Sequence, residues 1–176
     1  MQSVLISGLL VEFELPELAR QAPVIIEAQI EGYAIETYQI RMGPRELPLV
    51  FTRHQVRVEN VLKANNEVVQ SGQIISVDTM GGQTGTLSVI VDQEARFSPK
   101  ENVLLFLSKD KPPKADLLRP GQFAVFGGFQ GKYSIIFRAN ERLVKRVDGD
   151  FQDLENFRRS IRQALNQDGD TAKSLA

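Results

Sequence analysis

Short runs in which apolar and polar residues alternate dominate the chain. Alternate residues of the stretch PVIIEAQIE fall on opposite faces: Val24, Ile26, Ala28 and Ile30 on one, and Ile25, Glu27, Gln29 and Glu31 on the other. This period of two is typical of a half-buried strand. The same pattern predicts strands in TRHQVRV, QIISVDT, TLSVIVD, NVLLFLS, QFAVFGG and KYSIIFRA, which are separated by turn residues. We also expect two longer loops, one over residues 41–48 that links the early strands and one in the Pro-rich connector of residues 108–122.

The run VLLFL, residues 103–107, is apolar on both faces, which predicts a central strand. Strands this short and regularly spaced favour antiparallel architecture over alternating α/β units. We therefore expect an all-β, mainly antiparallel domain over residues 1–148. It would be a small barrel or a sandwich, and an OB-like barrel is one alternative.

Two segments have helical patterns. LPELARQ, Leu15–Gln21, predicts a short helix with Pro16 in its first turn, where a missing N–H costs little. Near the C-terminus, apolar residues recur every three or four positions and predict an amphipathic helix over residues 149–167 that packs on the domain, with Asp150 as its cap: Phe151, Leu154, Phe157, Ile161 and Leu165. Residues 168–176 have too little apolar surface to fold, so we expect a disordered tail.

Composition excludes several kinds of site. The 176 residues suit one domain, and a net charge of −1 gives no overall reason to expect nucleic acid as a partner. The chain has no cysteine and one histidine, which rules out disulfides, thiolate sites and a multi-histidine metal site within one chain. We expect no metal and no cofactor.

The stretch VDTMGGQTGTLSVIVD, residues 77–92, resembles a phosphate-binding loop only in its glycines. A phosphate loop needs a lysine and a helix after the glycines, whereas here a predicted strand follows. Glycines also supply the positive φ angles of tight hairpins. We therefore interpret this stretch as a hairpin.

A second glycine turn, FGGFQGKY, could form a nest of N–H groups that holds an anion beside Lys132, or it could be a turn where two backbones meet closely. If the two glycine turns lie near each other, they would form a site. The candidate ligand-binding residues are then Gly81, Gly82, Gly128, Gly131, Lys132 and Tyr133.

His54 and Asp78 are the candidates for catalysis, together with Glu94 or Asp92. A general base needs an orienting carboxylate and a nucleophile within reach, and the chain lacks the Gly-x-Ser-x-Gly elbow. In its strand, His54 shares a face with Val56 and Val58, so a histidine at the edge of the core is the competing interpretation.

Aromatic residues interleave with basic ones in the last third of the chain, a set that can stack bases or sugars or can form core: Phe123, Phe126, Phe129, Tyr133 and Phe137, with Lys132 and Arg138. The near-neutral charge weakens the nucleic-acid interpretation.

The N-terminal apolar run, residues 4–11, is too short to span a bilayer and lacks the basic start of an export signal. We therefore expect no transmembrane segment. The protein would be cytoplasmic, or extracytoplasmic (periplasmic or secreted) if Met1 replaces a removed signal.

The order of five segments resembles a β-rich domain of exported bacterial proteins of unassigned function. These segments are ELARQAPVIIEAQIEG, TRHQVRVENVLKAN, GQIISVDTMGG, ARFSPKENVLLFLS and FGGFQGKYSI, and together they span residues 17–136. The chain departs from that pattern at Ala64 and Lys100, where the family usually has glycine. The resemblance implies a compact barrel and an extracytoplasmic setting, and it brings no catalytic residues.

Because a full set of strands comes without a catalytic constellation, we expect a non-catalytic binding or interaction module of the bacterial cell envelope. Its partner would be a peptide, a glycan or an envelope protein. The alternatives are a hydrolase or metal-dependent enzyme that uses Asp78 and His54, and an OB-like nucleic-acid binder.

Overall fold

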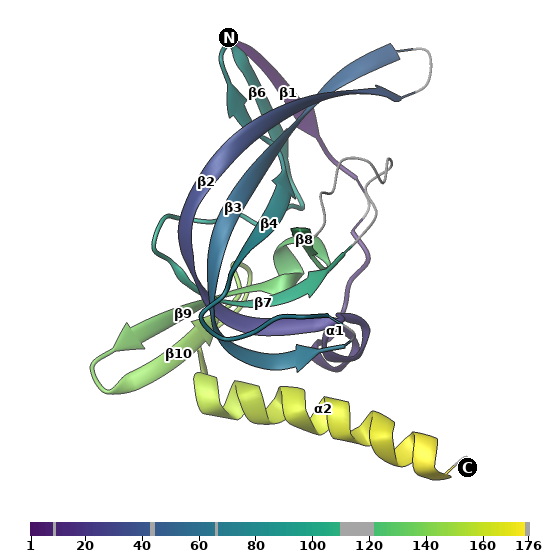
Figure 1. Cartoon of the computed structure of the whole chain (residues 1–176), viewed down its shortest axis with the longest axis vertical. Helices are drawn as coiled ribbons and strands as arrows, with labels where there is room; N and C mark the ends of the chain where they lie inside the picture. The colour runs from purple at the N-terminus through teal and green to yellow at the C-terminus, as the bar shows by residue number, and fades with distance from the viewer. Residues whose placement is uncertain (9, 43–44, 66, 110–121, 175–176) are drawn as a thin grey trace.

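The structure is a computed structural model, and it describes residues 1–8, 10–42, 45–65, 67–109 and 122–174. A sheet of eight strands forms the body, in the order β11-β10-β9-β7-β2-β3-β4-β8 (Figure 1). In chain order these strands are β2 (Val24–Met42), β3 (Arg45–Ala64), β4 (Ile74–Met80), β7 (Asn102–Ser108), β8 (Gln122–Val125), β9 (Lys132–Arg138), β10 (Glu141–Lys145) and β11 (Gln152–Asp153).

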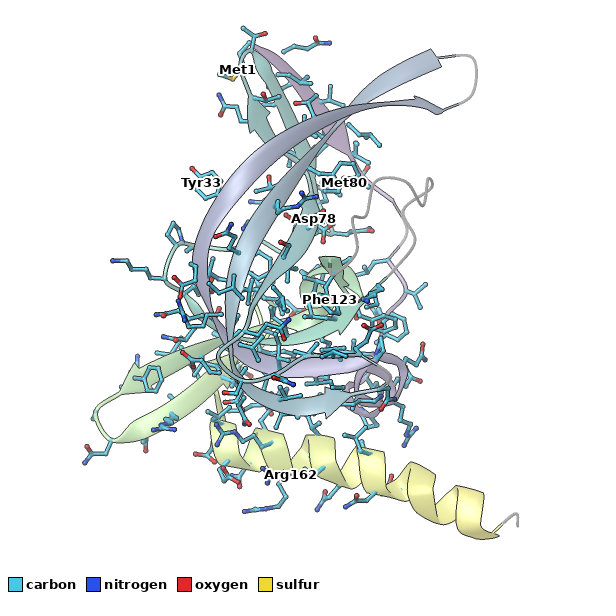
Figure 2. All side chains as sticks on the ribbon, in the orientation of Figure 1. Met1, Tyr33, Asp78, Met80, Phe123 and Arg162 are labelled. Carbon is cyan, nitrogen blue, oxygen red and sulfur yellow. The ribbon has the colours of Figure 1, made fainter. Side chains whose placement is uncertain are left out.

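Five of these strands close into a small barrel. β8 pairs in parallel with β4 and antiparallel with β7, through Leu107↔Val125 and Ser108↔Ala124, so the ring runs β7-β2-β3-β4-β8. The one parallel pair in an otherwise antiparallel ring gives the barrel an OB-like strand order. The expected all-β, mainly antiparallel class is confirmed, and of the two expected architectures, barrel or sandwich, the sheet forms a partly closed barrel. Its interior is filled by alternate apolar residues of these strands, among them Ile26, Val56, Val77, Leu105 and Phe123, the last labelled in Figure 2.

A second core lies on the outer surface of the barrel wall. The outward residues of β2 and β7, such as Ile25, Leu104 and Phe106, pack with α1 (Leu15–Gln21) and α2 (Leu154–Ser174). Residues 103–107 are fully buried because β7 contributes to both cores, which confirms the prediction of a central strand. In Figure 1, α2 lies across the end of the body below β2 and β3.

A second, smaller sheet contains β1 (Gln2–Ile6), β6 (Leu87–Val91) and β5 (Gly82–Thr84), in the order β1-β6-β5. β5 and β6 are antiparallel and joined by a tight turn, which confirms the predicted hairpin. Only Gly85 lies in the hairpin turn, whereas Gly81 and Gly82 form the corner at which the chain leaves β4 for this sheet. A Cβ at Gly82 would overlap Thr52 Oγ1, so this corner requires a residue without a side chain.

The expected loop over residues 41–48 is wrong. Its flanks continue as strand, so that β2 and β3 pair from Val24↔Ala64 to Met42↔Arg45 and extend from the body as one long hairpin (Figure 1). Backbone hydrogen bonds pair these two strands, and hydrophobic periodicity does not report them. The Pro-rich connector that we expected to be a loop lies mostly outside the described residues.

The C-terminal helix begins later than predicted. Residues 152–153 form β11 against β10, and the carboxylate of Asp153 accepts a hydrogen bond from Asn156 N at 2.9 Å, so Asp153 rather than Asp150 caps α2. Phe151 therefore lies outside the helix and is exposed, whereas Leu154, Phe157 and Ile161 are buried as predicted. The helix continues to Ser174, beyond the expected end at Gln167.

A buried ion pair holds α2 against the barrel. Arg158 donates from Nη2 to Glu27 Oε1 at 2.5 Å and from Nε to Glu27 Oε2 at 2.9 Å, and Asn60 Nδ2 donates to Oε2 at 2.9 Å. The Glu27 side chain is 5% exposed and that of Arg158 is 18% exposed.

No helix among the described residues is long and apolar enough to cross a membrane.

We expect Arg158→Ala to lower the free energy of unfolding by about 3 kcal/mol, because it leaves the Glu27 carboxylate buried without its cation. Arg159→Ala, one position along on the exposed face of α2, should change it by about 0.5 kcal/mol or less. Chemical denaturation of both variants measures the difference. Equal effects would show that the ion pair does not hold the helix.

Candidate functional site

A two-part cleft runs along a loop that closes one end of the barrel. This loop, residues 92–97, is called the capping loop because Ala95 is buried in the barrel core and Phe97 packs against that core. The larger part, the outer cleft, has a volume of about 540 Å³, and the smaller part, the inner cleft, about 370 Å³. Glu94, Ala95 and Arg96 line both parts, so the capping loop borders each of them.

The outer cleft lies over one face of the β9–β10 hairpin. Lys132, Ser134 and Ile136 alternate along β9 and point into it, and Lys145 lies opposite Ser134 on β10. Period-two alternation explains this arrangement, because Tyr133 and Ile135 point to the opposite face and fill the second core.

Glu101 ties this face to the loop before β7. Its Oε1 accepts hydrogen bonds from Lys132 Nζ and Ser134 Oγ, both at 2.7 Å, and its Oε2 accepts one from Ser98 N at 3.0 Å. Although burial opposes ionisation, these hydrogen bonds lower the pKa of Glu101. Lys132 Nζ also donates to the carbonyl oxygen of Arg96 at 2.7 Å, so one ammonium group fixes the capping loop over β9.

Glu94 lies at the junction of the two parts of the cleft. Burial raises the pKa of its carboxyl group, and hydrogen bonds from Met80 N at 3.0 Å and Ala95 N at 3.1 Å partly oppose that rise. The carboxyl group thereby fastens the capping loop to the end of β4.

His54 lines the inner cleft from β3. Its Nε2 is 3.1 Å from Thr79 Oγ1, and its ring meets the ring of Phe97 edge-on at 4.6 Å. Burial lowers the pKa of His54 to about 4, and the charge of Lys132 contributes, whereas that of Asp78 opposes the shift. The ring is therefore neutral at pH 7.

Asp78 lies on the other face of the same sheet. It pairs across the strands with Arg53, while His54 pairs with Val77, so the Asp78 and His54 side chains point in opposite directions. Arg53 donates from Nε at 2.9 Å and from Nη2 at 3.0 Å to the two carboxylate oxygens of Asp78. The structure therefore does not bring the two catalytic candidates together.

The two glycine turns flank the start of the capping loop. Gly81 and Gly82 line the inner cleft beside His54, and Gly128 lines a neighbouring groove that shares Glu94 with it. A Cβ at Gly128 would overlap the carbonyl oxygen of Gln93, so this turn lets two backbones meet closely. Phe129 N donates to that oxygen at 3.0 Å.

The remaining ligand-binding candidates are separated. Gly131 is buried against Phe126, and the ring of Tyr133 packs on Phe157, with centroids 4.6 Å apart. Lys132 reaches the outer cleft but is paired with Glu101. Whether any candidate binds a ligand stays a prediction.

The aromatic set also divides. Phe123 belongs to the barrel interior, Phe126 contacts the second core, and Phe137 is 59% exposed on the β9–β10 hairpin. Phe129 lines the outer cleft, with the Arg146 guanidinium 5.8 Å from its ring centre. The structure therefore does not assemble these rings into one stacking surface.

Among the described residues, no group of three or more histidine, aspartate or glutamate side chains is placed to hold a metal ion. No protein-family model matches the chain, and no curated protein matches it significantly. The resemblance to exported bacterial domains therefore stays a prediction.

Sequence reasoning missed Arg96 and Lys145, which both line the outer cleft. Arg96 lies in the capping loop, where apolar and polar residues show no regular alternation. Lys145 was missed because its strand, β10, was not predicted. The alternation of Glu141–Lys145 was the available signal for β10, and it is weak because the segment is short.

The low pKa of His54 gives a pH dependence with a definite sign. The unfolded chain binds a proton near pH 6.5 and the folded chain near pH 4, so stability is lost as pH falls through this window. Relative to His54→Gln, the wild type should lose about 3 kcal/mol of unfolding free energy between pH 7 and pH 4. Glu94 contributes a pH dependence of opposite sign, which the comparison cancels because both proteins contain this residue. Denaturant unfolding curves of both proteins at pH 7 and at pH 4 measure the difference. Equal losses of unfolding free energy in the wild type and in His54→Gln would contradict the burial argument.

Proposed function

We propose that this protein is a non-catalytic binding module whose ligand occupies the two-part cleft along the capping loop. The partner class is a peptide, a glycan or a protein, in the bacterial envelope setting that the sequence resemblance implies. The observation that carries the proposal is a cleft whose walls are fixed by internal hydrogen bonds. Its volume of about 540 Å³ lies within the range of small-ligand sites.

The walls of the cleft are preorganised. Lys132 holds the capping loop by its backbone, Glu94 fastens it to β4, and Phe97 anchors it in the barrel end. A ligand that enters a site with fixed walls loses less free energy to ordering than one that must organise loops. This arrangement favours binding.

The chemistry of the inner cleft supports catalysis less well. A histidine with a pKa of about 4 is a weak general base at neutral pH. The carboxylate of Asp78 is held by Arg53 on the opposite face of the sheet, where it cannot orient the His54 ring.

The OB-like strand order is the one observation that favours nucleic-acid binding, because OB folds use the outer face of the strands that correspond here to β3 and β4. The arginines on that face are neutralised, however. Arg53 pairs with Asp78 and Arg57 pairs with Glu31 at 2.6 Å. Such a face lacks the positive potential that draws in phosphates.

The proposal predicts where bound ligands perturb backbone amides. In ¹⁵N NMR titrations with short peptides, chito-oligosaccharides and oligothymidylate, a peptide or glycan probe should shift residues 92–97 and 132–136 without product formation. Arg57→Gln, on the outer face of β3, should leave these shifts unchanged. Shifts confined to β3 and β4 with oligothymidylate, or probe cleavage that His54→Ala abolishes, would contradict the proposal.

A further inference from the structure

Four cations line the outer cleft, and two of them are already neutralised. Lys132 Nζ is 2.7 Å from Glu101 Oε1. Arg146 donates to both carboxylate oxygens of Asp148, at 2.5 and 2.8 Å. These two pairs form part of the wall and leave little charge for a ligand.

The other two cations, Arg96 and Lys145, have no carboxylate partner among the described residues. Arg96 is exposed, and its side chain makes no hydrogen bond within the described part of the chain. Lys145 Nζ lies over the ring of Phe151, 5.0 Å from its centre. One cation comes from the capping loop and the other from β10, so two different elements bring them to the same cleft.

The carboxylates of the outer cleft do not cancel both charges. Asp148 is paired with Arg146, and the carboxyl group of Glu94 already accepts hydrogen bonds from Met80 N and Ala95 N. Asp92 is exposed and adds one negative charge at the rim. Two free cations against one free carboxylate favour a ligand with a single negative charge and disfavour a polyanion.

The rest of the lining is largely apolar. Ile136 and Phe129 are half-buried, and Val147 is 79% exposed. An apolar group of a ligand would cover this surface and remove it from water, which is favourable at roughly 25 cal/mol per Å².

We infer that the outer cleft binds a carboxylate joined to an apolar group, with Arg96 and Lys145 on the carboxylate and Ile136, Phe129 and Val147 on the apolar part. A small aryl-alkyl carboxylic acid and the C-terminal residue of a peptide share this chemistry. The guanidinium of Arg96 can donate two parallel hydrogen bonds to a carboxylate, and Lys145 adds a point charge. This inference rests on the proposed function.

The first test separates the charge from the apolar group. Isothermal titration and ¹⁵N NMR are carried out with 4-phenylbutyrate and acetyl-Gly-Gly-Phe, each beside its primary amide. Both acids should shift the cleft amides, and each amide should bind about tenfold more weakly, because a hydrogen bond to a charged group contributes about 1.5 kcal/mol or more. Tighter binding of the peptide acid would indicate a peptide as the natural source, and tighter binding of 4-phenylbutyrate a small acid.

The second test assigns the cations. Arg96→Gln and Lys145→Gln should each weaken the binding of both acids, by about tenfold for Arg96→Gln. The binding of the two primary-amide probes should stay unchanged. Arg159→Gln on the exposed face of α2 is the matched control and should change nothing. Because the Arg96 side chain makes no hydrogen bond or ion pair within the described part of the chain, its variant should keep the native free energy of unfolding.

Equal binding of acids and amides, unchanged affinity in Arg96→Gln, or no binding of either acid would overturn the inference. If neutral peptides or glycans still shift the cleft amides, only the carboxylate inference fails and the binding module stands. If no probe shifts them, both proposals fail.

Discussion

The rest of the structure depends on β7, a strand that is buried on both faces. Leu105 points into the barrel, while Leu104 and Phe106 point to α1, α2 and β9. A strand in this position must pair on both edges and satisfy two cores at once, so its register is fixed by apolar contacts on either side. β7 pairs with β2 and β8 to close the barrel and with β9 to extend the sheet.

The cleft is a consequence of that extension. β9 presents Lys132 and Ser134 to the outer cleft because Tyr133 and Ile135, which alternate with them, are held in the second core. With that face fixed, Lys132 and Ser134 point toward Glu101 and toward the loop that closes the barrel end. One ammonium group then joins the sheet extension, the capping loop and the strand that follows Glu101. The site and the fold therefore share the same hydrogen bonds.

Much of the fold could be predicted from local pattern, and the exceptions have physical causes. The period of two located most strands of the barrel, and the double-sided apolar run identified β7. The long arms of β2 and β3 were missed because backbone pairing leaves no hydrophobic signature, and the helix start was misplaced because Asp150 and Asp153 are equally good caps by residue type.

The site was less predictable than the fold. The glycines and His54 were identified by their type, but only the three-dimensional structure separates Asp78 from His54 and brings Arg96 and Lys145 to one cleft. Which lysine or arginine lacks a partner is decided by contacts between residues far apart in the chain. Lys132, for example, meets a carboxylate on another loop at Glu101.

The most direct test of this account is native-state hydrogen exchange, with the amides of β7, β9 and α2 followed separately. If β7 fixes both cores and the cleft, these amides should exchange through one cooperative opening, at the free energy of global unfolding. Exchange of β9 and α2 at a distinctly lower free energy than β7 would contradict the account. It would show that β9 and α2, and the cleft that β9 lines, unfold independently of the barrel.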